Sequence, residues 1–454
     1  MNTSYFMRRV AAAALSVSFL VLACADGAPA ALAFTKTGES IEYGLSVALS
    51  SDLNRAPGAS AKWSSADPTV ASVDQAGKAI ALKAGTTVVS VVDGGQTATL
   101  TLTVLPLEFV SVSAGFYHAC GVTKLGTGYC WGDNSYGTLG DGTTTPSLVP
   151  RPVNGGSLRF SLIDVGQDHA CGKTTGGAVY CWGYNNYGQV GDGTKQNTRS
   201  TPVLVPGVTS PIDIGAGENH TCALMSSGQV MCWGGNTYGQ LGDQTTTDRL
   251  SPVVVSGQTT FKALSVGARH NCGTLANNQL YCWGSNSGGQ LGDGTKTDRT
   301  SPVFTQFVGV SATAASIGAG RSMTCAALTN GGAYCWGITP TATQTRPTLV
   351  SGAPSSGSVV GGGLHACGIS TAAAAYCWGW NGGALGNGDI ANSDTPVLVA
   401  GGLSFSMITV SWNDFTCGIA TTGKSYCWGK NAAGALGDGT QTTRTSPQEI
   451  AGQR

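Results

Sequence analysis

The chain has 454 residues, of which 24 are basic and 24 acidic, so its formal net charge is zero and only 11% of its residues are charged. A nucleic-acid-binding protein normally carries a basic excess or a basic stripe, so this balance argues against nucleic acid as a partner. Sixty-eight glycines recur among Trp, Val and Cys residues at fixed places, which indicates many tight turns rather than disorder.

The first residues have the features of a targeting segment. Arg8 and Arg9 precede an apolar run that ends before Cys24, as in a secretory signal, and the run is too short for a transmembrane helix. The four residues that end at Cys24 resemble a bacterial lipoprotein box. We therefore expect a signal peptide over residues 1–23 and a lipid on Cys24, with ordinary cleavage after Ala33 as the alternative. Either route predicts an extracytoplasmic protein, a surface lipoprotein or a freely secreted one.

Residues 31–105 form a separate β module. Apolar and polar residues alternate over 86–92 and 97–104, the two-residue period of half-buried strands. The run 63–74, with the glycine turns that follow it, resembles the group 2 bacterial immunoglobulin-like domain, a small β-sandwich of surface and secreted bacterial proteins. Trp63 is expected in the core of this sandwich.

The remainder of the chain, residues 107–454, repeats one unit seven times. Each copy has two cysteines that are separated by nine residues and followed by Trp-Gly, as in Cys120 and Cys130-Trp131-Gly132. The first cysteines of successive copies lie 42 to 53 residues apart, which is about the length of one four-stranded propeller blade. The short junction with the preceding module predicts that the two parts sit together almost rigidly.

The third copy shows the β character of the unit. Short β-prone runs at 210–214, 220–224, 229–233 and 251–255 are divided by Gly, Ser and Asn turns. One four-stranded sheet cannot bury both of its faces, but seven sheets stacked radially can. The sequence therefore predicts an all-β protein, a seven-bladed β-propeller with an N-terminal immunoglobulin-like β-sandwich.

Three motifs of this copy carry a family resemblance: Gly217-Glu-Asn-His220, Trp233-Gly-Gly-Asn236 and Gly239-Gln-Leu-Gly242. They resemble the regulator of chromosome condensation repeat, a seven-bladed propeller family, and the likeness covers roughly residues 107–454. The fifth copy lacks the Gly-Gln-Leu-Gly segment after Trp336-Gly337, so we expect its blade to be shortened at the outer loop.

The paired cysteines are predicted to form disulfides within each blade. In an antiparallel hairpin centred on Leu125, Cys120 lies opposite Cys130, at a distance that a disulfide accepts. Zinc binding is the less favoured interpretation. Structural zinc sites favour cysteines two to four residues apart, and the cysteines of exported proteins are usually oxidised. The predicted pairs are Cys120–Cys130, Cys171–Cys181, Cys222–Cys232, Cys272–Cys282, Cys325–Cys335, Cys367–Cys377 and Cys417–Cys427.

The other repeated residues are predicted to be structural. All five histidines stand two residues before the first cysteine of a copy, where the remaining two copies carry Met323 and Phe415. A metal ligand or general base would not be exchanged for Met or Phe, so we expect buried histidines. The repeated Trp is expected between blades, and the Gly-Asp-Gly-Thr segments are expected to be turns rather than calcium loops. No catalytic motif is present, so we predict no enzyme, no cofactor and no metal.

Two variable loops of each blade are candidates for recognition. The turn between the first two strands and the loop after Trp-Gly are expected to open on the same face of the ring, and both are rich in aromatic and charged residues. Unconstrained drift of turn residues is the alternative. The candidate ligand-binding residues are Phe116, Tyr117, Tyr136, Asp168, Tyr184, Tyr187, Glu218, Asn219, Tyr238, Arg269, Arg321, Trp380 and Asp414, together with Asn236.

Three functions stay open. We rank first an extracytoplasmic binding or scaffold protein, a monomer that recognises an unknown protein or glycan and contacts a membrane only through Cys24. The family resemblance implies guanine-nucleotide exchange as the second, although the export signal and neutral charge argue against it. The third is a secreted enzyme inhibitor.

Overall fold

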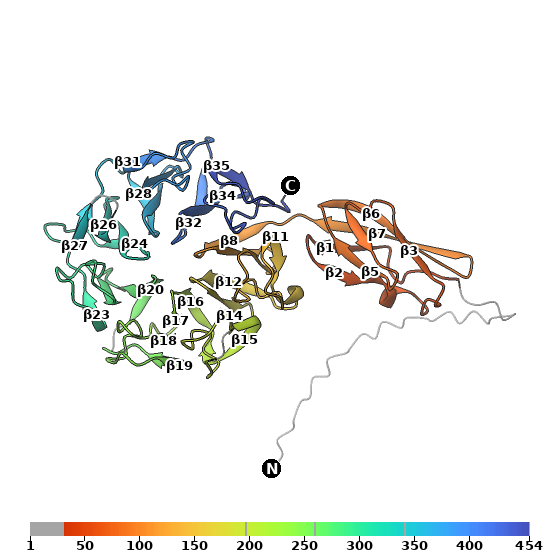
Figure 1. The fold of residues 1–454 in the computed structure, drawn as a ribbon, viewed down its shortest axis with the longest axis horizontal. Helices are drawn as coiled ribbons and strands as arrows, with labels where there is room; N and C mark the ends of the chain where they lie inside the picture. The colour runs from red at the N-terminus through yellow and green to blue at the C-terminus, as the bar shows by residue number, and fades with distance from the viewer. Residues whose placement is uncertain (1–30, 196–197, 258–259, 340–341, 454) are drawn as a thin grey trace, which may run out of the picture.

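The computed structural model describes residues 31–195, 198–257, 260–339 and 342–453. The predicted signal peptide and Cys24 lie outside these residues. The described chain forms a small β-sandwich followed by a ring of seven sheets, which confirms the predicted all-β fold (Figure 1). Within the described residues, no helix has the length and apolar character needed to cross a membrane.

The sandwich consists of two sheets that enclose one core. The first sheet has the order β1-β7-β6-β3 and comprises β1 (Gly38–Glu42), β7 (Gln96–Leu105), β6 (Gly85–Asp93) and β3 (Lys62–Ser65). The second has the order β2-β5-β4 and comprises β2 (Ser46–Ala48), β5 (Lys78–Ala81) and β4 (Ala71–Val73). A 3-10 helix, η1 (Leu49–Asp52), follows β2. Trp63 is buried between the sheets with Leu49 and Leu100, as predicted.

Each propeller blade is an antiparallel sheet of four consecutive strands, and the first strand of each lines the central channel. These first strands are β8 (Phe109–Ala114), β12 (Phe160–Val165), β16 (Pro211–Ala216), β20 (Phe261–Val266), β24 (Ala314–Ala319), β28 (Ser356–Gly361) and β32 (Phe405–Val410). The second strands are β9 (His118–Thr123), β13 (His169–Thr174), β17 (His220–Met225), β21 (His270–Leu275), β25 (Met323–Leu328), β29 (His365–Ser370) and β33 (Phe415–Ala420).

The third and fourth strands build the outer half of each blade. The third strands are β10 (Gly128–Gly132), β14 (Ala178–Tyr184), β18 (Val230–Gly234), β22 (Leu280–Gly284), β26 (Ala333–Ile338), β30 (Ala375–Gly379) and β34 (Ser425–Gly429). The fourth strands are β11 (Ser147–Pro152), β15 (Thr198–Thr209), β19 (Arg249–Val254), β23 (Arg299–Phe304), β27 (Thr343–Leu349), β31 (Ser393–Leu398) and β35 (Arg444–Glu449), and η2 (Val153–Gly156) follows β11. Every fourth strand contains a proline, which protects this outer edge from pairing with another chain.

The ring closes through packing of the last blade against the first, without a strand shared between the chain ends. Strands β32 and β33 of blade 7 contact β8 of blade 1. The indole Nε1 of Trp131 in blade 1 donates a hydrogen bond to the carbonyl of Ala435 in blade 7 at 2.9 Å. The two ends of the propeller lie side by side in Figure 1.

A disulfide joins the second and third strands of every blade. Cys120 lies opposite Cys130 in the register of β9 and β10, and the corresponding cysteines of the other blades are paired in the same way. These are the seven pairs that the spacing predicts. Their half-cystines are buried among the hydrophobic residues between blades, so each disulfide is part of the core.

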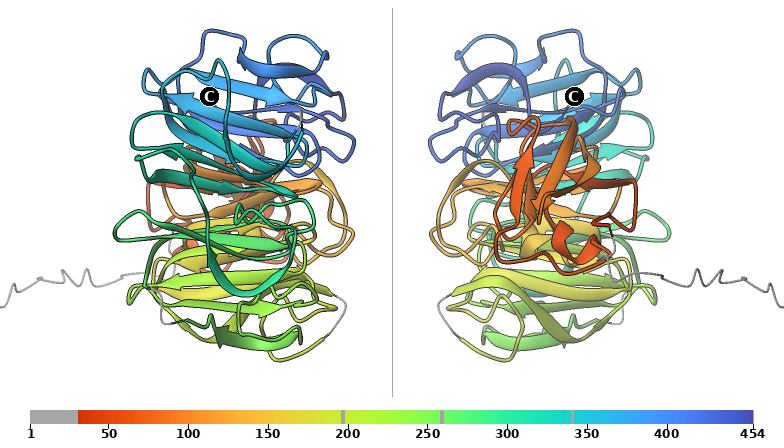
Figure 2. Two further views of the ribbon diagram at one scale, coloured as in Figure 1. Left: turned by 90° about the vertical axis from the view of Figure 1, so that its left-hand side faces the viewer. Right: turned by 90° about the vertical axis from the view of Figure 1, so that its right-hand side faces the viewer.

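The sandwich docks on the outer side of blade 1 (Figure 2). The hydroxyl of Tyr129 donates to the carbonyl of Tyr43 at 2.8 Å, and Thr127 donates to the buried carboxylate of Glu42. The backbone N–H of Leu107 bonds the carbonyl of Gly452 at 2.8 Å, so the linker is also tied to the end of the propeller. These contacts agree with the expected close association of the two parts.

Candidate recognition face

The two variable loops of each blade meet on one face of the propeller. Arg269 belongs to the turn between the first two strands of blade 4. Its Nη1 donates to the hydroxyl of Tyr238 at 3.2 Å, and Tyr238 lies in the loop after Trp-Gly, the last loop of blade 3. The same guanidinium lies over the Tyr238 ring and forms two hydrogen bonds with Glu218, at 2.6 and 2.8 Å. The carboxylate of Glu218 raises the pKa of Arg269. We call the surface formed by these loops the recognition face.

Exposed aromatic side chains occupy the recognition face. Tyr136 of blade 1 contacts Tyr184 of blade 2 with ring centroids 4.8 Å apart, and Tyr184 lies 6.4 Å from Tyr187. Tyr117 is 43% exposed, Tyr136 is 40% exposed and Trp380 is 49% exposed. Because these rings do not fill the blade cores, they are available to an incoming partner.

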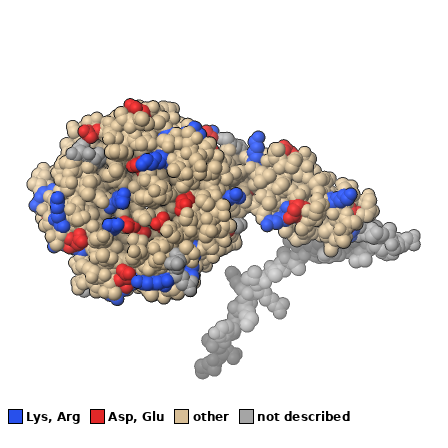
Figure 3. All heavy atoms as spheres, viewed as in Figure 1, with Lys and Arg blue, Asp and Glu red and all other residues tan. Residues whose placement is uncertain are grey.

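Charged residues stand near the centre of the same face. The guanidinium of Arg321 in blade 5 lies 5.8 Å from the ring centroid of Phe116 in blade 1, so these two blades meet across the opening. Asp168 is half-buried, and burial raises the pKa of its carboxyl, with smaller contributions from Asp133 and Glu218. Acidic and basic side chains both gather around the middle of the ring in Figure 3.

Two of the candidate residues are structural. Asp414 is only 6% exposed, has a positive φ of 61°, and accepts a hydrogen bond from Nζ of Lys430 at 2.5 Å. Asn236 is fully buried, and its amide donates to Asp243, Thr245 and Thr247. Asn219 and the remaining candidates lie on the face at least partly exposed. The expectation that Asp414 and Asn236 are free for a ligand is therefore wrong.

Leu364, in the first turn of blade 6, is a further side chain of the face and is 45% exposed. One residue of the face was not identified from the sequence. Lys430, in the last loop of blade 7, holds Asp414. The signal for Lys430 was its place after Trp-Gly, where blades 2 and 6 carry Tyr184 and Trp380.

The histidines form buried contacts between blades, as predicted. His169, His220, His270 and His365 are completely buried. In each case Nε2 reaches a Thr or Asn of the next blade, and that residue donates to a loop carbonyl of the histidine's own blade. We call each set an interface triad. The triads are His169–Thr221–Gln189, His220–Asn271–Gln240, His270–Thr324–Gln290 and His365–Thr416–Ala384.

The Gly-Asp-Gly-Thr segments are tight turns held by hydrogen bonds. Oδ1 of Asp192 accepts from both the backbone N–H and the hydroxyl of Thr194, while Oδ2 is paired with Arg199 at 2.5 Å. Across the described ranges, no group of three or more His, Cys, Asp or Glu side chains is placed to hold a metal ion.

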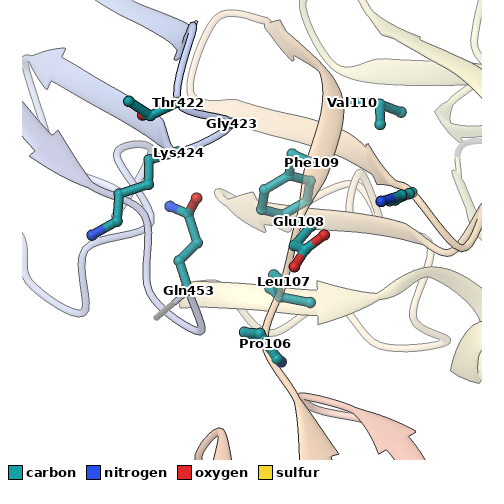
Figure 4. Close-up of a pocket in the computed structure, with 10 residues that line it drawn as sticks. Pro106, Leu107, Glu108, Phe109, Val110, Thr422, Gly423, Lys424 and Gln453 are labelled. Carbon is teal, nitrogen blue, oxygen red and sulfur yellow. The ribbon is translucent and has the colours of Figure 1, made fainter.

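The central channel and a cavity beside the linker contain none of the candidate recognition residues. The central channel is lined by the first strands, and there Asp164 accepts from the hydroxyl of Ser113 at 2.6 Å and the N–H of Ala216 at 2.9 Å. The other, of about 380 Å³, lies where the linker passes blade 7, between Leu107, Phe109, Lys424 and neighbouring residues (Figure 4). Neither cavity gathers a catalytic set of side chains.

Both parts of the chain match known protein families. Residues 96–344 match the RCC1-like domain, and residues 30–104 match the bacterial Ig-like domain (group 2). The chain is 34% identical over 151 residues to probable E3 ubiquitin-protein ligase HERC4 of Homo sapiens, a match that covers 32% of this chain and 14% of HERC4. It is 36% identical over 140 residues to the ultraviolet-B receptor UVR8 of Arabidopsis thaliana, covering 30% of this chain and 32% of UVR8. The chain thus spans only a small part of HERC4 and about a third of UVR8.

Solved structures share the fold of the ring. Human WBSCR16 superposes with a TM-score of 0.62 and 18% identity, covering 71% of this chain and 93% of that protein. Prp20p of Saccharomyces cerevisiae gives a TM-score of 0.62 and 19% identity, covering 76% of this chain and 87% of that protein. At these identities the similarity concerns the propeller fold alone.

Proposed function

Because the chain belongs to the RCC1-like domain family and carries a group 2 bacterial Ig-like domain before its propeller, we propose that it is an extracytoplasmic binding protein. Its recognition face binds another protein, and the immunoglobulin-like domain holds that face away from the cell. Exchange and ligase activities belong to other members of the family, and we do not transfer them to this chain.

One observation carries this proposal: exposed rings and charges are gathered on a single face. Tyr117, Tyr136, Tyr187 and Trp380 are 39 to 49% exposed there, beside Arg269, which is partly exposed, and Arg321, which is exposed. Trp, Tyr and Arg are the side chains that most often carry the binding energy of protein interfaces. The neighbouring acidic groups, Glu218 and Asp168, supply charge complementarity for orientation.

Two observations support the extracytoplasmic location. Seven disulfides form readily in an oxidising compartment and are rare in reducing ones. Leu32 is 5% exposed in the sandwich core, and its N–H donates to Gln96 at 2.7 Å. Cleavage after Ala33 would remove this contact, so the lipoprotein route through Cys24 suits the fold better.

The binding proposal is tested by photo-crosslinking in intact cells. A crosslinking amino acid at Tyr187 should capture a defined protein, whereas one at Leu204, which is 49% exposed on the outer strand of blade 2, should not. With the partner purified, Trp380→Ala and Tyr187→Ala should each weaken its binding at least about tenfold, and Leu204→Ala should leave it unchanged. Equal crosslinking at Tyr187 and Leu204, equal loss of affinity in the face variants and in Leu204→Ala, or capture of glycans alone would contradict a protein-binding face.

The location is tested separately. Cys24→Ala should release the protein from the membrane fraction or stall its processing. A mature N-terminus at Phe34 would show instead that the lipoprotein route is wrong.

A further inference from the structure

Six of the seven blade interfaces are completed by the loop that follows Trp-Gly. In each, a backbone carbonyl of this loop accepts a hydrogen bond from the indole Nε1 of the next blade. The pairs are Trp131–Ala435, Trp182–Thr138, Trp233–Gln189, Trp283–Gln240, Trp336–Gln290 and Trp428–Ala384, at 2.8 to 3.1 Å. The loop therefore satisfies a buried polar group that would otherwise be costly.

The same loops also insert an aliphatic side chain. The residue after the accepting carbonyl is Leu or Val and is completely buried in all six blades: Leu139, Val190, Leu241, Leu291, Leu385 and Leu436. In blade 3, Leu241 belongs to one core cluster with Cys222, Cys232, Val255 and Trp283. The loop thus supplies one hydrogen-bond acceptor and one aliphatic group to each interface.

Blade 5 has no such loop. Its third strand ends at Ile338 and its fourth begins at Thr343; these two residues pair, and the N–H of Thr339 bonds the carbonyl of Ala342 at 2.9 Å. Among the described residues, the interface between blades 5 and 6 therefore receives neither the carbonyl nor the aliphatic side chain. The sequence predicted the shortened loop but not this consequence.

A cavity takes the place of the missing loop. Its volume is about 190 Å³, and Cys335, Val350 and Trp378 line it, in the places that Cys232, Val255 and Trp283 hold around Leu241. Among the described residues, Nε1 of Trp378 has no acceptor, whereas the other six repeated indoles have one. Trp378 and Cys335 are each 5% exposed, while the corresponding Trp283 and Cys232 are fully buried.

The surroundings fit a peptide rather than water alone. Cys335, Val350 and Trp378 give the cavity one apolar side, and Met323 and Ala366, which replace the His and the Thr or Asn of an interface triad, belong to the same core cluster. The rest of the lining is largely polar and includes Thr339, Gln344, Thr348, Ser351 and Asp394. A cavity of about 150 Å³ with apolar walls can hold a benzene molecule, so this space is ample for one aliphatic side chain.

We propose that the gap between blades 5 and 6 binds an extended segment of a partner protein. The segment inserts a leucine-like side chain beside the Cys325–Cys335 disulfide and presents a backbone carbonyl to Nε1 of Trp378. It thereby completes the interface as the chain's own loops complete the other six. The proposal does not depend on ligand binding by the candidate residues of the recognition face, because none of those candidates lines the cavity.

The test uses a labelled peptide that copies residues 237–244 of blade 3, Thr-Tyr-Gly-Gln-Leu-Gly-Asp-Gln, with fluorescence anisotropy as the readout. We expect saturable one-to-one binding, and at least about tenfold weaker binding when the peptide leucine is replaced by aspartate. Trp378→Phe, which removes the N–H donor, should weaken binding about tenfold. Trp233→Phe is the matched control and should leave the affinity unchanged, because the N–H of Trp233 is already bonded to Gln189.

A second variant tests the cavity itself. Val350→Phe should fill it and abolish peptide binding in protein that still melts cooperatively. No binding by the wild-type protein at millimolar peptide, equal binding of the aspartate peptide, or indifference to both Trp378→Phe and Val350→Phe would overturn the proposal. A dimer in sedimentation that Val350→Phe dissociates would overturn it in favour of a second copy as the occupant.

Discussion

His169 Nε2 lies 2.9 Å from the hydroxyl oxygen of Thr221 in the next blade, and both side chains are completely buried. The Thr221 hydroxyl donates its proton to the carbonyl of Gln189 at 2.9 Å, so it can only accept from the histidine. His169 is therefore the neutral tautomer that carries its proton on Nε2. The same carbonyl also accepts from Trp233, so one loop atom joins two residues of the neighbouring blade.

In two of the three interfaces without a triad, the histidine and the Thr or Asn of the next blade are replaced together. Where the next blade offers Ala366 or Ala119, the histidine is replaced by Met323 or Phe415. His118 is the exception, because it faces the blade that carries Ala170. Its Nε2 is buried and has no partner in the described structure.

The first prediction concerns this unpaired nitrogen. Ala170→Thr places a hydroxyl where Thr221 stands in the next interface, with the Thr138 carbonyl available as its acceptor. Because a buried donor without a partner costs about 1–3 kcal/mol, we expect the free energy of unfolding to rise by about 1 kcal/mol. Urea denaturation measures the change. Ala119→Thr is the control, since its neighbour is Phe415, and it should give no gain; equal gains in both variants would contradict the explanation.

The second prediction concerns how the stability of the protein depends on pH. Burial lowers the pKa of His169 and His270 to about 3, and those of His118, His220 and His365 to about 4. In the unfolded chain histidine titrates near 6.5, so between about pH 6.5 and 4 the unfolded state binds the extra protons. Stability should therefore fall as the pH falls through this window, by about 1.4 kcal/mol per pH unit for each histidine.

Carboxyl groups oppose this trend in part. Burial raises the pKa of Asp213 to about 6, and also raises those of Asp164 and Asp168, so these groups take up protons in the folded state. His169→Met, the residue found at the equivalent position of blade 5, isolates one histidine. Its unfolding free energy should depend on pH less steeply than that of the wild type, by about 1.4 kcal/mol per unit between pH 4 and 6. Parallel curves for the two proteins would show that His169 is not buried as a neutral side chain.

The fold could be predicted from the sequence because the same motif occurs in every blade. The constant interval from Cys120 to Cys130 fixes the hairpin register, and seven copies fix the number of blades. The contacts between blades could not be predicted from the sequence in this way. The triad joins His169, Thr221 and Gln189 across up to 52 positions, and the acceptor is a main-chain carbonyl whose orientation no residue type reveals.

The sequence predicted which loops share this face, but it did not predict the surroundings of two of their residues. Loop position identified Tyr187 and Trp380, because exposed turn tips follow from blade topology. Asn236 was misjudged as variable, although an Asn follows Trp-Gly at the same distance in six copies, which is the mark of a structural residue. Asp414 was misjudged because its pairing with Lys430 depends on a left-handed backbone that the sequence does not disclose.

The third prediction compares two tryptophans with different surroundings. Trp233→Phe removes a buried N–H that donates to Gln189 at 3.0 Å, whereas Trp378→Phe removes an N–H without an acceptor among the described residues. Both changes remove similar packing. We expect Trp233→Phe to lower the free energy of unfolding by about 1 kcal/mol more than Trp378→Phe does. Urea denaturation of both variants measures the difference, and an equal loss in the two would show that the carbonyl contact contributes nothing.

The last prediction concerns the order in which the disulfides are reduced. Cys335 is 5% exposed at the gap left by the short loop of blade 5, while the other thirteen paired cysteines are fully buried. Reduction needs direct access of a thiolate or phosphine to sulfur, so under mild reductant Cys325–Cys335 should open first. Alkylation followed by peptide mapping should then find label on Cys325 and Cys335 while the other twelve remain unlabelled. The unreduced, denatured protein is the control and should show no labelled cysteine among the fourteen. Simultaneous labelling of all blades would mean that reduction follows global unfolding and that the gap gives no access to the disulfide.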